Sequence, residues 1–250
     1  MTSLQAYLLI FLGVIVGGIV FSLFKKTNHR FLDAVNVFGG AFLFAVCFIQ
    51  LIPHLYGQSS HTCGHSHYES FLLSVPVGIF ILAGFIVQLL LENLSKGIEH
   101  GHSHLSSHAS PKGFSLLIGL SLHAFLEGMP VVSHEGHIHE ALVWGIFIHN
   151  IPITMVLTTI LLKADYSKWK RYTFIFIFAV MSPLGSVLNR TFSAVFGNYD
   201  VVIMALVVGI LLHVAVSILF THEDKGTRFS KMAIILLAFM LAYFMPACSH

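Results

Sequence analysis

Charged residues are scarce in this chain, and their scarcity excludes a soluble globular protein. Only 10% of the 250 residues are Asp, Glu, Lys or Arg, whereas about a quarter of an ordinary soluble domain is charged. So few charges could not form the polar surface of a soluble protein of this size. Nothing in the composition favours DNA or RNA binding, since the net charge is only +2. With 56% hydrophobic residues, the chain is predicted to be a membrane protein that crosses the bilayer several times.

Cysteine is also scarce, and histidine is abundant. Three cysteines, an odd number, exclude a disulfide framework. The 17 histidines outnumber the 11 Asp and Glu residues together. A membrane protein with more imidazole than carboxylate is expected to handle transition metals or protons.

Eight segments are long and apolar enough to cross a bilayer, which takes about 20 mostly apolar residues. They are Leu4–Phe24, Ala34–His54, Phe71–Leu91, Phe114–Ser133, Ala141–Lys163, Tyr172–Asn189, Val201–Thr221 and Phe229–Cys248. The loops between them are short, so little is left for a soluble domain. Residues 1–250 are therefore predicted to form one all-α polytopic transmembrane domain of eight helices.

The basic residues predict the orientation of the spans. Twelve of the 13 Lys and Arg residues fall on the loops after the first, third, fifth and seventh spans, and only Arg190 lies on the other side. The positive-inside rule then places these four loops in the cytoplasm and both termini outside. Lys25 and Lys26 follow the first span and no basic residue precedes it, so this span is expected to be retained. The plasma (inner) membrane is the expected location.

Three polar side chains are predicted to lie inside the fourth and fifth spans. His123 and Glu127 are four residues apart and share one helix face. A short outer loop joins the two spans, so His149 in the fifth lies at a compatible depth. Ionisable groups inside a membrane are costly and mark functional sites, and imidazole with carboxylate suits a divalent ion such as zinc. Pro130 and Pro152 favour a hydrated path, because each frees a backbone carbonyl that needs a polar neighbour.

Other polar groups in the spans have simpler explanations. A lone His can hydrogen-bond a neighbouring helix, and for His213 this role and a metal role are evenly balanced. Gln50 is expected to form a hydrogen bond between helices. Asp33 and Glu92 lie at span ends, where water could solvate them.

Further histidines cluster in the loops, where a metal role competes with a solvated or pH-sensitive loop. The predicted cytoplasmic loop at about residues 93–113 carries His100, His102, His104 and His108. The outer loops carry His61, Cys63, His65 and His67, and then His134, His137 and His139 with Glu135 and Glu140. Because such clusters occur on both faces, we favour loose metal capture. Cys63 and Cys248 are both predicted outside, and the sequence does not decide whether they pair.

The arrangement of spans and motifs resembles the ZIP (Zrt-, Irt-like protein) family of metal transporters. The segment from His123 to Gly128 is similar to the family motif His-Ser-x-x-Glu/Asp-Gly, and His149 to Pro152 is similar to His-x-x-Pro. Weaker matches lie at Phe38-Gly39-Gly40, Gln50 to Pro53, Ser182 to Gly185 and Gly209 to His213. The resemblance covers the whole chain and includes the His-rich loop between the third and fourth spans.

The resemblance implies uptake of a divalent metal into the cytoplasm, mainly Zn²⁺ and often Fe²⁺ or Mn²⁺. It places the transport site between the fourth and fifth spans, with His123, Glu127 and His149 matching ligands. It also adds Asn150, at a position that is often acidic, and His213, at a position that is often Tyr. In the family the first, fourth, fifth and sixth spans are thought to move against the rest.

The chain also departs from the family pattern. Ala124 and Ile153 stand where relatives often carry polar or acidic ligands, and Asn150 is neutral. Family members commonly hold two metals, whereas this centre has one carboxylate. The sequence therefore predicts a single transported ion.

Two other functions use the same residues. A membrane-embedded zinc-dependent hydrolase would need three ligands and a metal-bound water, but no second intramembrane carboxylate is available as a base. A bis-His haem protein would use His123 and His149 but would leave Glu127 unexplained. The expected partners are divalent metal ions and the lipid bilayer, and the sequence leaves open whether the chain forms a homodimer.

Overall fold

The computed structural model describes residues 1–23, 29–61, 75–94, 111–133, 135–164, 166–192, 199–220 and 228–245. In these residues the predicted all-helical fold is confirmed. The helices are α1 (Ser3–Leu23), α2 (His29–Val46), η1 (Cys47–Leu51), α3 (Ile52–His61), α4 (Val77–Leu94), α5 (Pro111–Gly128), η3 (Met129–Val131), α6 (Glu140–Lys163), α7 (Lys168–Thr191), α9 (Asp200–Phe220) and α10 (Arg228–Tyr243). Each predicted span coincides with one helix or one continuous helical run.

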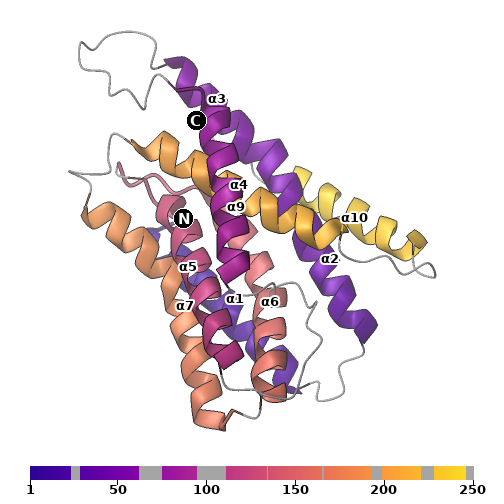
Figure 1. Cartoon of the computed structure of the whole chain (residues 1–250). Helices are drawn as coiled ribbons and strands as arrows, with labels where there is room; N and C mark the ends of the chain where they lie inside the picture. Colours follow the sequence, from indigo (N-terminus) through magenta and orange to yellow (C-terminus); the bar gives the residue numbers. More distant parts are fainter. Residues whose placement is uncertain are drawn as a thin grey trace.

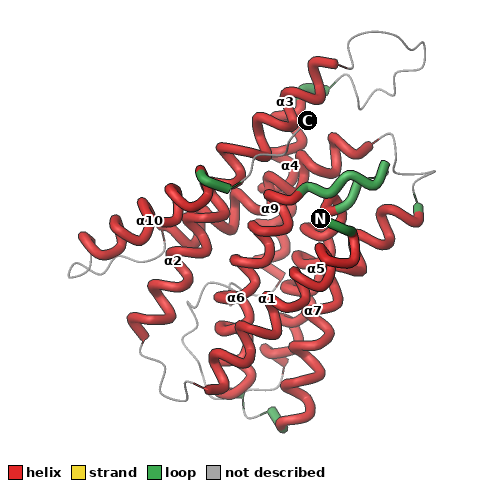
Figure 2. Tube along the Cα trace, turned by 180° about the vertical axis from the view of Figure 1, so that it is seen from behind, coloured by secondary structure: helices red, strands yellow, loops and turns green. Residues whose placement is uncertain are grey.

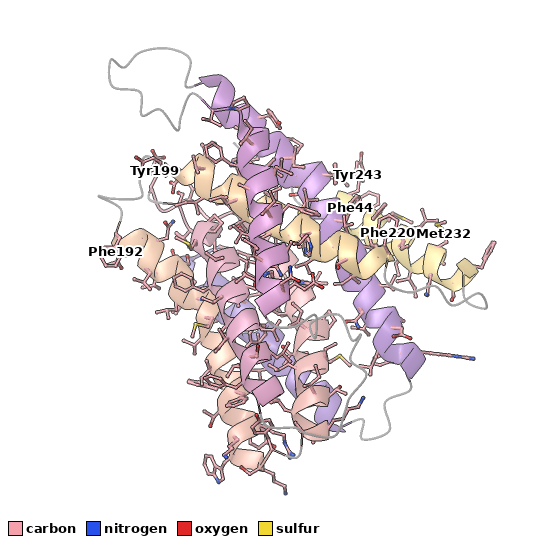
Figure 3. The ribbon with its side chains drawn as sticks, viewed as in Figure 1. Phe44, Phe192, Tyr199, Phe220, Met232 and Tyr243 are labelled. Atoms are coloured by element: carbon pink, nitrogen blue, oxygen red, sulfur yellow. The ribbon has the colours of Figure 1, made fainter. Side chains whose placement is uncertain are left out.

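Length and composition support a membrane-spanning bundle. Within the described residues, five helical segments are long and apolar enough to cross a bilayer, namely Arg30–Gly57, Phe114–Val131, Glu140–Lys163, Lys168–Thr191 and Asp200–Phe220. Three shorter apolar helices, Ser3–Gly18, Val77–Asn93 and Phe229–Tyr243, match the remaining predicted spans. Large apolar side chains such as Phe220, Met232 and Tyr243 are exposed on the outside of the bundle (Figure 3), as expected for a lipid-facing surface.

The second predicted span is part of a longer run that the sequence analysis did not foresee. Residues 29–61 continue from α2 through η1 into α3. In η1 the Ile52 N–H bonds the Cys47 carbonyl five residues back, which is the bonding of a π-helix. Pro53 follows directly and lacks an N–H, so the regular four-residue ladder is interrupted at this point.

The helices pack as two sets. The first set contains α1, α5, α6 and α7, in which α1 packs on α6 and on α7, and α5 packs on α7 (Figures 1 and 2). The second set contains α2, α3, α4, α9 and α10, in which α4 packs on α9 and α10 packs on α2. The sets meet mainly where α2 crosses α6, and in smaller contacts of α4 and α9 with α5.

Glycines bring the helices within each set very close together. On α4 and α9, a Cβ added at Gly84 would overlap the Leu206 carbonyl, and one at Gly209 would overlap the Ile81 carbonyl. On α5 and α7, Gly128 and Gly185 make equivalent contacts with facing backbone carbonyls. Small residues at helix contacts are a usual way to pack membrane helices, since they let the backbones approach.

Candidate metal site within the membrane

His123 and Glu127 form a buried polar pair on α5. Both side chains are almost completely buried, and His123 Nε2 lies 3.2 Å from Glu127 Oε2. The pair arises locally, because residues four apart share one face of a helix, as predicted. The helix ends at Gly128 and continues as the short 3₁₀ turn η3, which contains Pro130. The proline therefore terminates α5 directly after the pair.

Helix α7 holds the other carboxylate oxygen. The buried Ser182 hydroxyl donates a hydrogen bond to Glu127 Oε1 over 3.2 Å. The close contact between Gly128 and the Ser182 carbonyl makes this bond reachable. Ser182 was noted in the sequence only as part of a weak family match, and its role in holding Glu127 is a finding of the structure.

Gln88 on α4 orients the His123 ring. Its side chain is fully buried, and its Oε1 lies 3.0 Å from His123 Nδ1. With Nδ1–H donating to this oxygen, the tautomer assigned from the bond leaves the lone pair of Nε2 facing Glu127. A proton or a metal cation between these two atoms, which are 3.2 Å apart, would bind to both of them. Gln88 was not among the predicted site residues, although a Gln inside the apolar Phe71–Leu91 span was a usable signal.

His149 and Asn150 come from α6, which continues through Pro152 without ending. Both side chains are fully buried. The His123 and His149 rings meet edge to face with centroids 6.2 Å apart. An ion that holds two imidazoles tetrahedrally, with metal–nitrogen bonds of about 2.1 Å, sets their centroids about 5.2 Å apart. The two rings therefore need to approach by about 1 Å to share such an ion.

The side-chain amide of Asn150 is buried, and no hydrogen bond to it is found among the described residues. Neither its Oδ1 nor its Nδ2 has a hydrogen-bond partner within the part of the chain that the structure describes. Its backbone carbonyl accepts a bond from the Thr154 hydroxyl over 2.7 Å, so only the side chain is left over. A buried amide without a partner costs about 1–3 kcal/mol, which an ion or a water at this position would recover.

His213 on α9 belongs to a second pair. Its Nε2 lies 3.6 Å from Glu92 Oε2, and its ring meets Phe85 with centroids 4.7 Å apart. Glu92 lies at a span end, where the sequence left solvation open, and the structure shows that its partly exposed carboxylate also contacts this histidine. Gln88 and Glu92 are one turn apart on α4, so one helix face serves both His123 and His213.

The remaining sequence predictions divide into those the structure describes and those it does not. The interhelical bond of Gln50 is confirmed, since its Nε2 donates to the Ala242 carbonyl on α10 over 3.2 Å. Among the described residues, no three His, Cys, Asp or Glu side chains stand together as a complete metal site. Outside the described residues lie His65, His67, His100, His102, His104, His108, His134, Cys63 and Cys248, together with the side chain of His61.

The fold and this centre define a class of protein: a multi-pass, integral membrane protein with a buried cluster of metal-binding residue types between its helices. The family model of the ZIP zinc transporters matches residues 1–115 and 99–246, which together cover nearly the whole chain. The chain belongs to the ZIP zinc transporter family. Its members are transporters of zinc and other metals and not enzymes, so the alternative of a zinc-dependent hydrolase is set aside.

Individual relatives are distant. The chain is 24% identical to the zinc transporter ZIP1 of Takifugu rubripes in an alignment 260 positions long. This alignment covers 86% of this chain and 85% of the relative. It is 22% identical to the zinc transporter ZIP1 of Danio rerio in an alignment 254 positions long, which covers 85% of this chain and 83% of the relative. Protein zntD of Dictyostelium discoideum is 30% identical over 164 residues, which are 58% of this chain but only 24% of zntD.

Proposed function

We propose that this protein imports Zn²⁺ into the cytoplasm through a site between α5 and α6, the fourth and fifth predicted spans. His123, Glu127, His149 and Asn150 bind the ion. The observation that carries the proposal is the buried His123–Glu127 pair, in which an imidazole nitrogen and a carboxylate oxygen lie 3.2 Å apart inside the membrane. A divalent cation could bind to both of these donor atoms in place of a proton, and His149 and Asn150 would complete the ligand set. Fe²⁺ and Mn²⁺ suit the same oxygen and nitrogen donors.

The site is proposed to hold one ion at a time. Ala124 is buried, and Ile153 packs with it in an apolar cluster of α5, α6 and α7. The two positions that often carry ligands in relatives therefore contribute only apolar packing here.

A count of bound zinc tests the single-ion proposal. Purified protein is expected to bind one zinc more than its His149→Ala variant, whereas a two-metal centre would make this difference two. Metal-bound crystals with two ions between α5 and α6 would contradict the proposal directly.

The inner route is proposed to follow α4. From His123 the polar side chains continue through Gln88 and Glu92 to His213. His213 would then serve as a relay beyond the transport site, from which the His-rich loop at about residues 93–113 receives the ion.

The two packing sets supply a mechanism for alternating access. The proposed ligands lie on α5 and α6, in one set, whereas Gln88 and His213 lie on α4 and α9, in the other. Transporters commonly rock one bundle against another around a central site. In this chain such a movement would break and remake the Gln88–His123 bond, which joins the two sets.

Uptake of radioactive zinc into proteoliposomes tests the proposed function. The intact protein is expected to accumulate zinc, and His149→Ala is expected to lose most of this uptake because a ligand is missing. Gln50→Ala is the control, since it removes a partly buried polar contact between other helices and should retain uptake. Equal uptake by His149→Ala and the intact protein would move the path away from α5 and α6.

The Gln88 contact yields a separate prediction. Replacing Gln88 by Leu keeps the volume but removes the acceptor for His123 Nδ1, so the ring loses its fixed tautomer. Loss of such a supporting bond typically weakens metal affinity about 10–100-fold. The KM for zinc is therefore expected to rise by that factor, while Gln88→Glu, which keeps an acceptor, should remain closer to the intact protein. An unchanged KM in Gln88→Leu would remove Gln88 from the mechanism.

A further inference from the structure

A second pair of histidines meets at the end of the bundle that we expect to face outside. His54 comes from α3 and His139 lies directly before α6, and their rings meet edge to face with centroids 5.1 Å apart. His139 precedes His149 by ten residues on the same segment, which corresponds to roughly 15 Å along a helix. The pair is therefore separate from the transport site.

A short hairpin fixes the position of His139. Val132 and Ile138 form an isolated β-bridge, and Gly136 turns the chain with a φ of 87°, a value that favours glycine. The His139 N–H bonds the Val131 carbonyl over 3.1 Å, and the His137 N–H bonds the Ser133 hydroxyl over 3.1 Å. The backbone that carries His139 is thus held in place before any ligand arrives.

The ring separation agrees with shared metal ligation. Two imidazoles on one tetrahedral ion, with metal–nitrogen bonds of about 2.1 Å, have their centroids about 5.2 Å apart. The observed 5.1 Å for His54 and His139 is close to this value, so the two rings could share an ion without moving, although edge-to-face packing of two rings gives the same distance.

The His139 side chain is partly buried beside two other imidazoles. Burial lowers the pKa of His139 to about 4, with the nearby imidazoles of His54 and His137 contributing. Glu140, the next residue, accepts an ion pair from the N-terminal ammonium of Met1 over 3.0 Å, so this carboxylate is already engaged.

We propose that His54 and His139 form a second divalent-metal site at this outer end, suited to Zn²⁺ or a similar borderline ion. Water would complete the coordination, since no third His, Cys, Asp or Glu side chain stands with this pair among the described residues. This site binds metal whether or not the ion between α5 and α6 is transported, so it does not depend on the proposed function.

Cobalt(II) is the probe for this site, because tetrahedral cobalt absorbs visible light strongly. The parent is the full chain with Glu127→Gln and His149→Ala, which removes the proposed transport ligands. In this parent, His54→Phe keeps an aromatic ring against His139 but has no nitrogen, and His54→Cys keeps a ligand but has no ring. His29→Phe, which removes an imidazole at the start of α2, is the matched control.

The expected pattern separates ligation from ring packing. His54→Phe should lose one equivalent of tetrahedral cobalt, His54→Cys should retain it and add a thiolate-to-cobalt charge-transfer band, and the control should match the parent. Size-exclusion profiles and melting temperatures check that each variant is folded. If His54→Phe binds cobalt as the parent does, or if His54→Cys shows no charge-transfer band, the contact is aromatic packing only and the proposal is wrong.

Discussion

Zinc uptake is expected to fall about 30-fold or more when Glu127 is replaced by Gln. The substitution keeps the shape of the side chain and removes its charge from a fully buried position beside His123. Removing the negative charge that pairs with a buried cation, here the proposed metal ion, typically costs about 2–5 kcal/mol, and about 1.4 kcal/mol corresponds to a factor of ten. Initial uptake rates in proteoliposomes over a range of zinc concentrations measure the effect.

Ser182→Ala is the matched control for this substitution. It removes the hydrogen bond to Glu127 Oε1 and leaves the carboxylate in place. One such bond contributes about 0.5–1.5 kcal/mol, so the expected loss is about tenfold or less. Uptake by Glu127→Gln at the level of the intact protein would contradict the assignment of Glu127 as a ligand. Equal losses in both variants would show that α7 packing, and not the charge, is what matters.

The second large effect is expected on stability. Gly84→Ala and Gly209→Ala each place a methyl group into a backbone carbonyl of the facing helix, that of Leu206 and that of Ile81 respectively. Backbone cannot move aside as a flexible side chain can, so α4 and α9 must separate. Overpacking of this kind costs about 1–3 kcal/mol or more. Both variants are therefore expected to melt well below the intact protein when purified in detergent.

Gly57→Ala serves as the comparison for these glycine substitutions. A Cβ at Gly57 meets no atom within 4 Å, so its melting temperature should stay at that of the intact protein. A Gly84→Ala variant that melts with the Gly57→Ala control would mean that the α4–α9 contact is looser than described.

Features set by local patterns could be predicted from the sequence. Eight apolar segments are evident from hydropathy, because each spanning helix must be apolar by itself to lie in lipid. The shared helix face of His123 and Glu127 was equally predictable, since a spacing of four residues decides it. The interhelical bond of Gln50 followed from the cost of a lone amide in the membrane, although its acceptor, the Ala242 carbonyl, did not.

Features that depend on packing between distant segments could not be predicted. Gln88 contacts His123 across 35 residues, and Ser182 contacts Glu127 across 55 residues, so neither spacing carries a pattern. The pairing of Glu92 with His213 likewise depends on how α4 packs on α9. The continuation of the helical run through α3 to residue 61 was not predicted for another reason. The residues after His54 are too polar to be included in an apolar span.

The π turn at Cys47–Leu51 decides the direction in which the end of its helical run faces. A π turn can be viewed as one extra residue in an α-helix, and each residue of an α-helix advances the side chains by about 100°. Everything after η1 is therefore rotated by about that angle relative to the phase that α2 sets. His54 lies just beyond the turn and faces His139. If the same residues formed an uninterrupted α-helix instead, His54 would turn by about 100° away from its partner, whereas deleting a single residue from η1 would restore the α-helix and leave His54 facing His139.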